Sequence, residues 1–152
     1  MEFLGQLALA LPLGLGALGS ALGIGAAGRA AAGAWAKEAK AGKPLNFSYI
    51  ILIGMPLSQT IYGFVLMFIG LSGAVYNPDI LSKNAGALLM IGLAGGLAEM
   101  SSAWIQGLIG AAGCRALSEG GGKGLVFIII AMGIVETVGL FGFVFLLLVM
   151  PA

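Results

Sequence analysis

Residues 124–150 read GLVFIIIAMGIVETVGLFGFVFLLLVM, and this stretch decides the fold. It contains a single charged residue, Glu136, and it is longer than the roughly 20 apolar residues that an α-helix needs to cross a bilayer. Three further stretches are long enough to span: residues 3–28 and 47–75 carry no charge, and residues 85–114 carry only Glu99. The sequence therefore predicts an all-α membrane protein with four transmembrane helices.

The composition excludes an ordinary soluble protein. Hydrophobic residues make up 60% of the 152 residues and charged residues only 9%, compared with about 25% charged residues in soluble domains. The net charge of +1 offers no basic face for nucleic acid, and the absence of histidine removes the commonest metal ligand and general base. Cys114 is the only cysteine, so no intramolecular disulfide can form and we expect a buried, inert thiol.

Charged and turn-forming residues separate the predicted spans. The connections are expected over residues 29–46, 76–84 and 115–123. Numbered in chain order, the spans are helices 1 to 4, and helices 1 and 3 are expected to extend past the membrane. Six of the seven basic residues lie in the first and third connections, so the positive-inside rule puts both termini outside and these loops in the cytoplasm. There the loops either contact soluble partners or are simply solvated. The N-terminal run lacks the basic start of a cleaved signal and is expected to stay as helix 1.

The second half of the chain repeats the first. Two pairs of segments are related, GIGAAGRA at 23–30 with LIGAAGCRA at 108–116, and SQTIYGFV at 58–65 with VETVGLFGFV at 135–144. We therefore predict two tandem duplicated hairpins, residues 1–75 and 76–152, which cross the membrane in the same direction. Such a parallel repeat suits assembly into a ring more than an inverted-repeat transporter.

Residue size differs between alternate helices. Glycine and other small residues are concentrated in helices 1 and 3, whereas helices 2 and 4 carry bulky Ile, Leu, Phe and Val. Because small faces let helix backbones approach closely, we expect helices 1 and 3 to form an inner layer, with helices 2 and 4 facing lipid and other proteins. Generic helix packing would produce the same pattern.

Glu136 is the candidate working residue. A carboxylate in the middle of a bilayer costs roughly 2.5–3.5 kcal/mol on insertion scales, so it usually faces protein and marks an ion or proton path. The first hairpin has Gln59 at the corresponding position, so only the second keeps an ionisable group there. Helical spacing supplies further oxygen atoms on helices 2 and 3, from Ser58, Gln59, Tyr62, the backbone carbonyl of Met55 and Gln106.

This excess of oxygen atoms favours Na⁺ over H⁺ as the bound ion, because a proton needs only the carboxyl. Pro56 supports the same interpretation: it removes a backbone N–H and frees the carbonyl of Leu52, so local distortion would turn a carbonyl near Met55 toward a cation. Two alternatives stay open. The ion is a proton, or Ser58, Gln59 and Gln106 only hydrogen-bond between helices.

Glu99 is the second carboxylate within the predicted spans, and nothing in the pattern assigns it a partner. It either flanks a ring lumen, has a second coupling role, or hydrogen-bonds to one of three polar neighbours, Ser101, Ser102 or Gln6. The tryptophans, Trp35 and Trp104, are expected to be interface or packing aromatics rather than ligands.

Together these residues resemble the c or K proteolipid of V-type rotary ATPases. The resemblance covers nearly the whole chain, and its most specific parts are MPLSQTIYGFV at 55–65, Gln106 with GAAG at 110–113, and VET at 135–137. The sodium-pumping bacterial type is the most similar, although Ser58 stands where a threonine is expected. The stretch GIVETVGL around Glu136 is closer to the proton-pumping eukaryotic form.

The resemblance implies a rotor-ring subunit that carries an ion by rotation coupled to ATP hydrolysis in partner subunits. It implies Na⁺ bound by Glu136 and four other residues, with Tyr62 hydrogen-bonded to the carboxylate; the other ligands are Met55 (backbone carbonyl), Ser58, Gln59 and Gln106. The implied partners are identical subunits in a ring, a membrane stator subunit, a central-stalk subunit on the cytoplasmic side and the lipid bilayer, with no nucleic acid. The implied location is a bacterial plasma membrane.

The chain is not expected to be an enzyme, since GGGKG at 120–124 lacks the spacing and the hydroxyl of a phosphate-binding loop. Two other classes of function compete with the rotor interpretation. A small secondary cation exporter would want an aromatic pocket around Glu136, and the nearby phenylalanines are too lipid-like to argue for one. A structural tetraspan protein would use Glu136 only for packing and would tolerate its replacement by glutamine.

Overall fold

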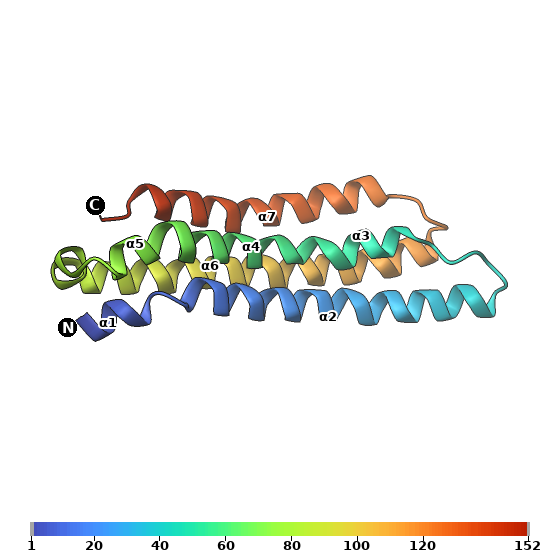
Figure 1. Ribbon diagram of the computed structural model, residues 1–152. Helices are drawn as coiled ribbons and strands as arrows, with labels where there is room; N and C mark the ends of the chain where they lie inside the picture. The colour runs from blue at the N-terminus through green and yellow to red at the C-terminus, as the bar shows by residue number, and fades with distance from the viewer. Residues whose placement is uncertain (1, 152) are drawn as a thin grey trace.

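The computed structural model describes residues 2–151 and consists of four long helical rods that lie side by side (Figure 1). The first rod contains α1 (Glu2–Leu7) and α2 (Leu11–Lys40); the second contains α3 (Ser48–Gly54), η1 (Met55–Leu57), α4 (Ser58–Val65), the π-helical η2 (Leu66–Leu71) and α5 (Ser72–Val75); the third is α6 (Pro78–Glu119) and the fourth is α7 (Leu125–Leu148). Each rod is long and apolar enough to cross a membrane. The predicted all-α fold with four spanning helices is confirmed.

Both hairpins run in the same direction. Figure 1 shows the two ends of the chain at the same end of the bundle as the connection between α5 and α6. The connections from α2 to α3 and from α6 to α7, which carry most of the basic residues, lie together at the opposite end. This arrangement is the one that a tandem, parallel duplication produces.

One predicted connection is too long, and one predicted helix is interrupted. The connection predicted over 76–84 is much shorter, because α6 already begins at Pro78, where the missing N–H of proline costs nothing. Asn77 caps this start by accepting two backbone N–H groups of the first turn, at 3.0 and 3.4 Å. The segment resembles a loop in sequence, and within it Asn84 does leave helical geometry (φ −123°, ψ 16°) and kinks α6. Helix 1 is likewise broken before Pro12.

The second rod is the least regular of the four. Pro56 lies in η1, a 3₁₀ turn that interrupts the α-helix where the sequence predicted distortion. The freed carbonyl oxygen of Leu52 faces α6, because a Cβ added at Gly110 would lie 2.9 Å from it. The π-helical stretch η2 follows, toward the end of the rod where the chain ends lie, and no sequence pattern predicted it. These irregular turns surround the polar middle of the rod.

Close packing of α2 against α6 depends on glycine. A Cβ at Gly107 would overlap the backbone of Gly23, and one at Gly19 would overlap the backbone of Met100. Only residues without side chains allow two helix backbones to approach this closely. The expectation that helices 1 and 3 pack tightly through small faces is therefore confirmed within the subunit.

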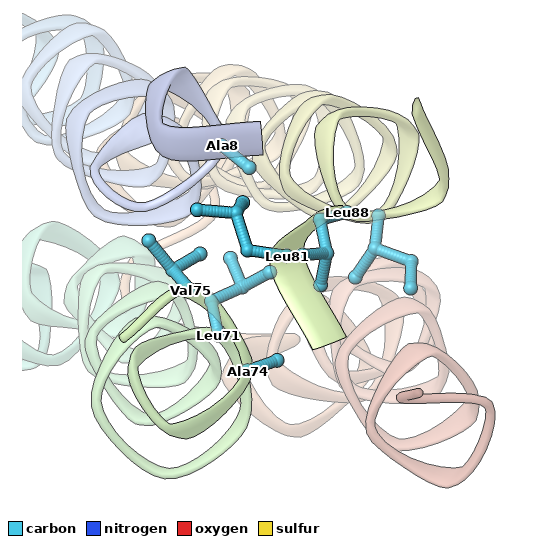
Figure 2. Packing of buried hydrophobic residues seen from close by; sticks show 7 residues of the cluster. Ala8, Leu71, Ala74, Val75, Leu81 and Leu88 are labelled. Carbon is cyan, nitrogen blue, oxygen red and sulfur yellow. The ribbon is translucent and has the colours of Figure 1, made fainter. Parts of the chain in front are cut away.

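Two apolar clusters lie toward opposite ends of the bundle. Figure 2 shows the first, at the end where the chain termini lie; its buried members are Ala8, Leu71, Ala74, Val75, Leu81, Leu88 and Ile91. The second lies toward the basic connections and consists of Ala31, Ala34, Tyr49, Leu52, Cys114, Leu117 and Met132. Cys114 is buried there, as expected. Between these clusters α6 carries buried polar side chains, which include Ser102 and Gln106.

A buried carboxylate fastens the connection between α2 and α3. Glu38 accepts a hydrogen bond from the backbone N–H of Asn46 at 2.9 Å and another from the hydroxyl of Tyr49. The indole N–H of Trp35 donates to the carbonyl of Asn46 at 2.9 Å, and its ring packs against that of Tyr49. Trp35 is therefore a packing residue, as expected, whereas Trp104 lies partly exposed on α6.

Candidate ion site

The carboxylate of Glu136 lies half-buried in the middle of α7 and receives hydrogen bonds from two other helices. The Tyr62 hydroxyl of α4 donates to Oε1 at 3.1 Å, and the Gln106 amide of α6 donates to Oε2 at 3.2 Å. Thr137, the next residue in the chain, donates instead to the carbonyl of Ile134 in its own helix. The carboxylate is thus held by side chains that come from across the bundle.

A continuous chain of polar contacts extends from this carboxylate into the second rod. The Gln106 carbonyl oxygen accepts a hydrogen bond from the Gln59 amide at 3.1 Å. The Ser58 hydroxyl lies 3.1 Å from the carbonyl oxygen of Gln59 and 3.2 Å from the backbone oxygen of Met55. All six residues singled out from the sequence therefore lie in one connected group that joins α7, α6, α4 and η1.

Local structure explains why these groups meet. The 3₁₀ turn at Pro56 lies just before Ser58, and the serine hydroxyl bonds the carbonyl of Met55 three residues earlier. Gln59 and Gln106 are completely buried, so their amides must find partners inside the protein. The Tyr62 ring stacks on Phe143 of α7 with centroids 6.0 Å apart and an interplanar angle of 8°, which directs its hydroxyl toward the carboxylate.

Sequence reasoning missed the part that Ser102 plays in this group. Its hydroxyl accepts a hydrogen bond from the Gln59 amide at 3.0 Å and donates to the carbonyl of Val135 at 2.9 Å. The amide of Gln106 also donates to the carbonyl of Met132, at 3.1 Å. The signal for Ser102 was its position four residues before Gln106, which puts both side chains on one face of the helix.

Glu99 has none of the partners expected for it. The carboxylate is completely buried inside the subunit, so it does not flank a lumen, and neither of its oxygen atoms has a hydrogen-bond partner among residues 2–151. Ser101 donates to the carbonyl of Ala98, Ser102 donates to Val135, and Gln6 lies exposed on α1. The side chain of Glu99 therefore stands apart from the connected group.

The polar group combines one carboxylate with several neutral oxygen atoms. Within the described residues, no cluster of three or more His, Cys, Asp or Glu side chains is close enough to hold a metal ion. Divalent cations are generally held by several carboxylates, so a single carboxylate among amide, hydroxyl and backbone oxygens is suited to one monovalent cation or one proton.

A family model described as the C subunit of ATP synthase matches residues 7–70 and, a second time, residues 89–149. The chain belongs to the ATP synthase C-subunit family. The two matches in tandem confirm the duplication of the hairpin. No curated protein matches the chain. As a member of the ATP synthase C-subunit family, the chain is an ion-translocating membrane rotor subunit of a rotary ATPase, and it has no catalytic site of its own.

Proposed function

We propose that this member of the ATP synthase C-subunit family is the proteolipid (c or K) of a V-type rotary ATPase and that it carries Na⁺ on Glu136. The observation that supports this proposal is the gathering of neutral oxygen atoms around a single carboxylate in the middle of the spans. The proposed ligands are Glu136, Gln106, Gln59, Ser58 and the backbone carbonyl of Met55.

The contacts within the site support binding of a cation larger than a proton. Each proposed ligand oxygen already lies within 3.2 Å of another member of the group, so small side-chain adjustments would direct these oxygens at one enclosed ion. A proton would be satisfied by Glu136 alone and would not need the oxygens of Ser58 and Gln59 as ligands. The carboxylate charge and the ion charge would cancel, and the loaded subunit would then be neutral.

Charge neutralisation explains how binding is coupled to rotation. An ionised Glu136 facing lipid without its ion would cost several kcal/mol, whereas a loaded site is neutral and crosses the lipid-facing part of the cycle. A stator subunit would supply the aqueous access, and a basic stator side chain would displace the ion there. Tyr62 would hold the carboxylate inward between these events, since its hydroxyl already binds Oε1.

The proposal includes the assembly. Identical subunits form the ring, with residues 1–75 and 76–152 as its two successive hairpins, in a bacterial plasma membrane. Both termini lie outside, and the two basic connections at the other end of the bundle contact the central stalk in the cytoplasm. The separation of these connections from the chain termini supports this orientation.

A proton-carrying ring of the same type is the second candidate, and one observation favours it. The amide of Gln59 is satisfied by Ser102 and Gln106 without any ion, and the amide of Gln106 is satisfied by Met132 and Glu136. These side chains would then only connect helices, and Glu136 alone would take the proton.

Labelling with a fluorescent carbodiimide tests both candidates, because the reagent modifies only a protonated carboxyl that it can reach. The detergent-solubilised protein is labelled across a titration of Na⁺ at constant pH, and the modified residue is mapped by peptide mass. We expect labelling of Glu136 that Na⁺ suppresses, and loss of this suppression in Ser58→Ala and Gln59→Leu. The matched control is Ser72→Ala. It removes a hydroxyl that donates to the carbonyl of Phe68 in the same rod, and it should leave the Na⁺ effect unchanged.

Two results would decide against parts of the proposal. Labelling that follows pH but ignores Na⁺ assigns a proton ring. No labelling of Glu136 under any condition removes the ion site altogether and favours a structural role.

A further inference from the structure

Glu99 of α6 lies in a small space, called the niche below, beside glycines of α7 and α2. A Cβ added at Gly139 of α7 would lie 2.7 Å from its Oε2, and one added at Gly16 of α2 would lie 3.4 Å from its own Cβ. A side chain at position 139 would therefore compete with the carboxyl for space, whereas one at position 16 would only touch the Cβ of Glu99. The niche lies one helical turn beyond Glu136, since Gly139 follows it by three residues in the same helix.

Among residues 2–151, no basic residue lies in the stretches of helix that surround this niche. The nearest basic residues along α6 are Lys83 and Arg115, each sixteen residues away, which corresponds to about 24 Å of helix. The titratable side chains that the neighbouring helices bring to this part of the bundle are Tyr62 on α4 and Glu136 on α7, and neither is a cation. The apolar part of α2 contributes no charged group.

The surroundings of the carboxyl determine which cation it can hold. An ionised carboxylate without a partner in a low-dielectric interior costs many kcal/mol, so such a group neutralises itself by binding a cation. Na⁺ would need several oxygen ligands, yet neither oxygen of Glu99 has a polar partner within hydrogen-bonding distance among the described residues. The Ser102 hydroxyl, which also borders Gly139, already donates to a backbone carbonyl. A proton requires no further ligand.

We propose that Glu99 is a second cation site of the subunit, which holds a resident proton throughout the transport cycle. Its function is to keep the middle of the bundle at one negative charge, that of Glu136, so that the ion site takes one monovalent cation. An ionised Glu99 would make the local charge −2 and would favour a divalent cation or two monovalent ones. The proposal rests on the proposed function only in taking Glu136 as the group that exchanges its ion.

Access distinguishes the two carboxyls. Glu136 is half-buried and bound by two donors, Tyr62 and Gln106, whereas Glu99 is completely buried in the subunit and bound by none among residues 2–151. Exchange with water therefore belongs to Glu136. The proton on Glu99 stays in place because its oxygen atoms join no chain of hydrogen bonds that could carry it away, and the nearby Ser102 hydroxyl is engaged elsewhere.

Infrared spectroscopy tests the proposal directly, because a protonated carboxyl has a carbonyl stretch that an ionised one lacks. Spectra are recorded for purified Glu136→Gln and for the double variant Glu136→Gln with Glu99→Gln, at neutral pH. Their difference should contain one protonated-carboxyl band for each subunit. The same band should appear in the difference between wild type and Glu99→Gln at saturating Na⁺, where Glu136 is loaded. A further variant, Glu136→Gln with Gly139→Ala, should shift the frequency of the same band, because the new methyl group presses on Oε2.

The outcomes are distinct. Absence of the band from the difference spectrum means that Glu99 is ionised and overturns the proposal. A band that Na⁺ removes means that Glu99 belongs to the exchanging site, which also overturns it. Glu99→Gln alone should keep Na⁺ protection of Glu136 from carbodiimide within about twofold of the wild type. Failure of the proposed sodium site would instead appear in wild-type labelling and leave the infrared result standing.

Discussion

Replacement of Tyr62 by phenylalanine removes one hydroxyl from the ion site and changes little else. The aromatic ring, which stacks on Phe143 with an interplanar angle of 8°, is kept, so packing between α4 and α7 is preserved. The lost contact is the 3.1 Å hydrogen bond to Oε1 of Glu136. If this bond holds the carboxyl inward, its loss should release Glu136 more often.

The size of the effect depends on the charge of the carboxyl. A hydrogen bond between neutral groups contributes about 0.5–1.5 kcal/mol, and one to a charged group about 1.5–3 kcal/mol. For a protonated Glu136 the variant should therefore increase the released fraction about two- to tenfold. Because Na⁺ binds the ionised form, the difference of about 1–1.5 kcal/mol should weaken Na⁺ against H⁺ about five- to tenfold.

Carbodiimide labelling of Glu136 measures both quantities. The labelling rate without Na⁺ is compared at a pH where wild-type labelling is maximal, so that the carboxyl is protonated in every protein. The Na⁺ concentration that halves the rate is then determined at that pH. Tyr76→Phe is the matched control, because Tyr76 is exposed at the end of α5 and far from the site in sequence and along the rod. Equal rates and equal Na⁺ midpoints for Tyr62→Phe and wild type would refute the role of the hydroxyl.

Three further substitutions test the packing that supports the site. Gly107→Ala should lower the free energy of unfolding of the purified protein in denaturing detergent by about 1–3 kcal/mol. Gly86→Ala should not, because the space around Gly86 is open. Ser102→Ala leaves a buried amide of α4 with one partner fewer, so we expect a loss of about 1–3 kcal/mol in the same assay and weaker Na⁺ protection. Tyr49→Phe removes a donor to the buried carboxylate of Glu38 and should accelerate proteolysis of the connection between α2 and α3, while unchanged cleavage would mean that this bond does not fasten it.

Much of this structure could be predicted from the sequence because a bilayer leaves few choices. Every backbone polar group within the bilayer must be satisfied inside the protein, so long uncharged stretches have to be helices. Spacing within helix 2 then fixed which side chains share a face, and Ser58, Gln59 and Tyr62 do meet near Glu136. Which side chains share a helical face, and which residue of the first hairpin corresponds to Glu136 of the second, could be predicted in this way.

Contacts with backbone acceptors and the packing between helices were not accessible from the sequence. The proton donated by Ser102 goes to a backbone carbonyl of α7, and a backbone acceptor leaves no trace in a sequence. The π-helical turns of η2 contain Gly70, where a Cβ would press on Met150 and Leu147 near the end of the chain, and such a contact cannot be read from the sequence. The sequence offered Glu99 three polar neighbours as partners. In the fold none of them bonds the carboxyl, which lies against Gly139.

The unequal halves of the duplicated chain have a consequence for energy conversion. Gln59 stands where the second hairpin has Glu136, so under the proposed function each set of four helices binds one ion instead of two. A ring of given circumference then moves half as many ions in each revolution, and each ion receives twice the work from a given amount of ATP. Since one charge moved against 100 mV costs about 2.3 kcal/mol, this change roughly doubles the potential against which the ring can pump. Ionisation of Glu99 would restore a second charge to each set of four helices and reverse the gain, which is a physical reason for a proton to remain on it.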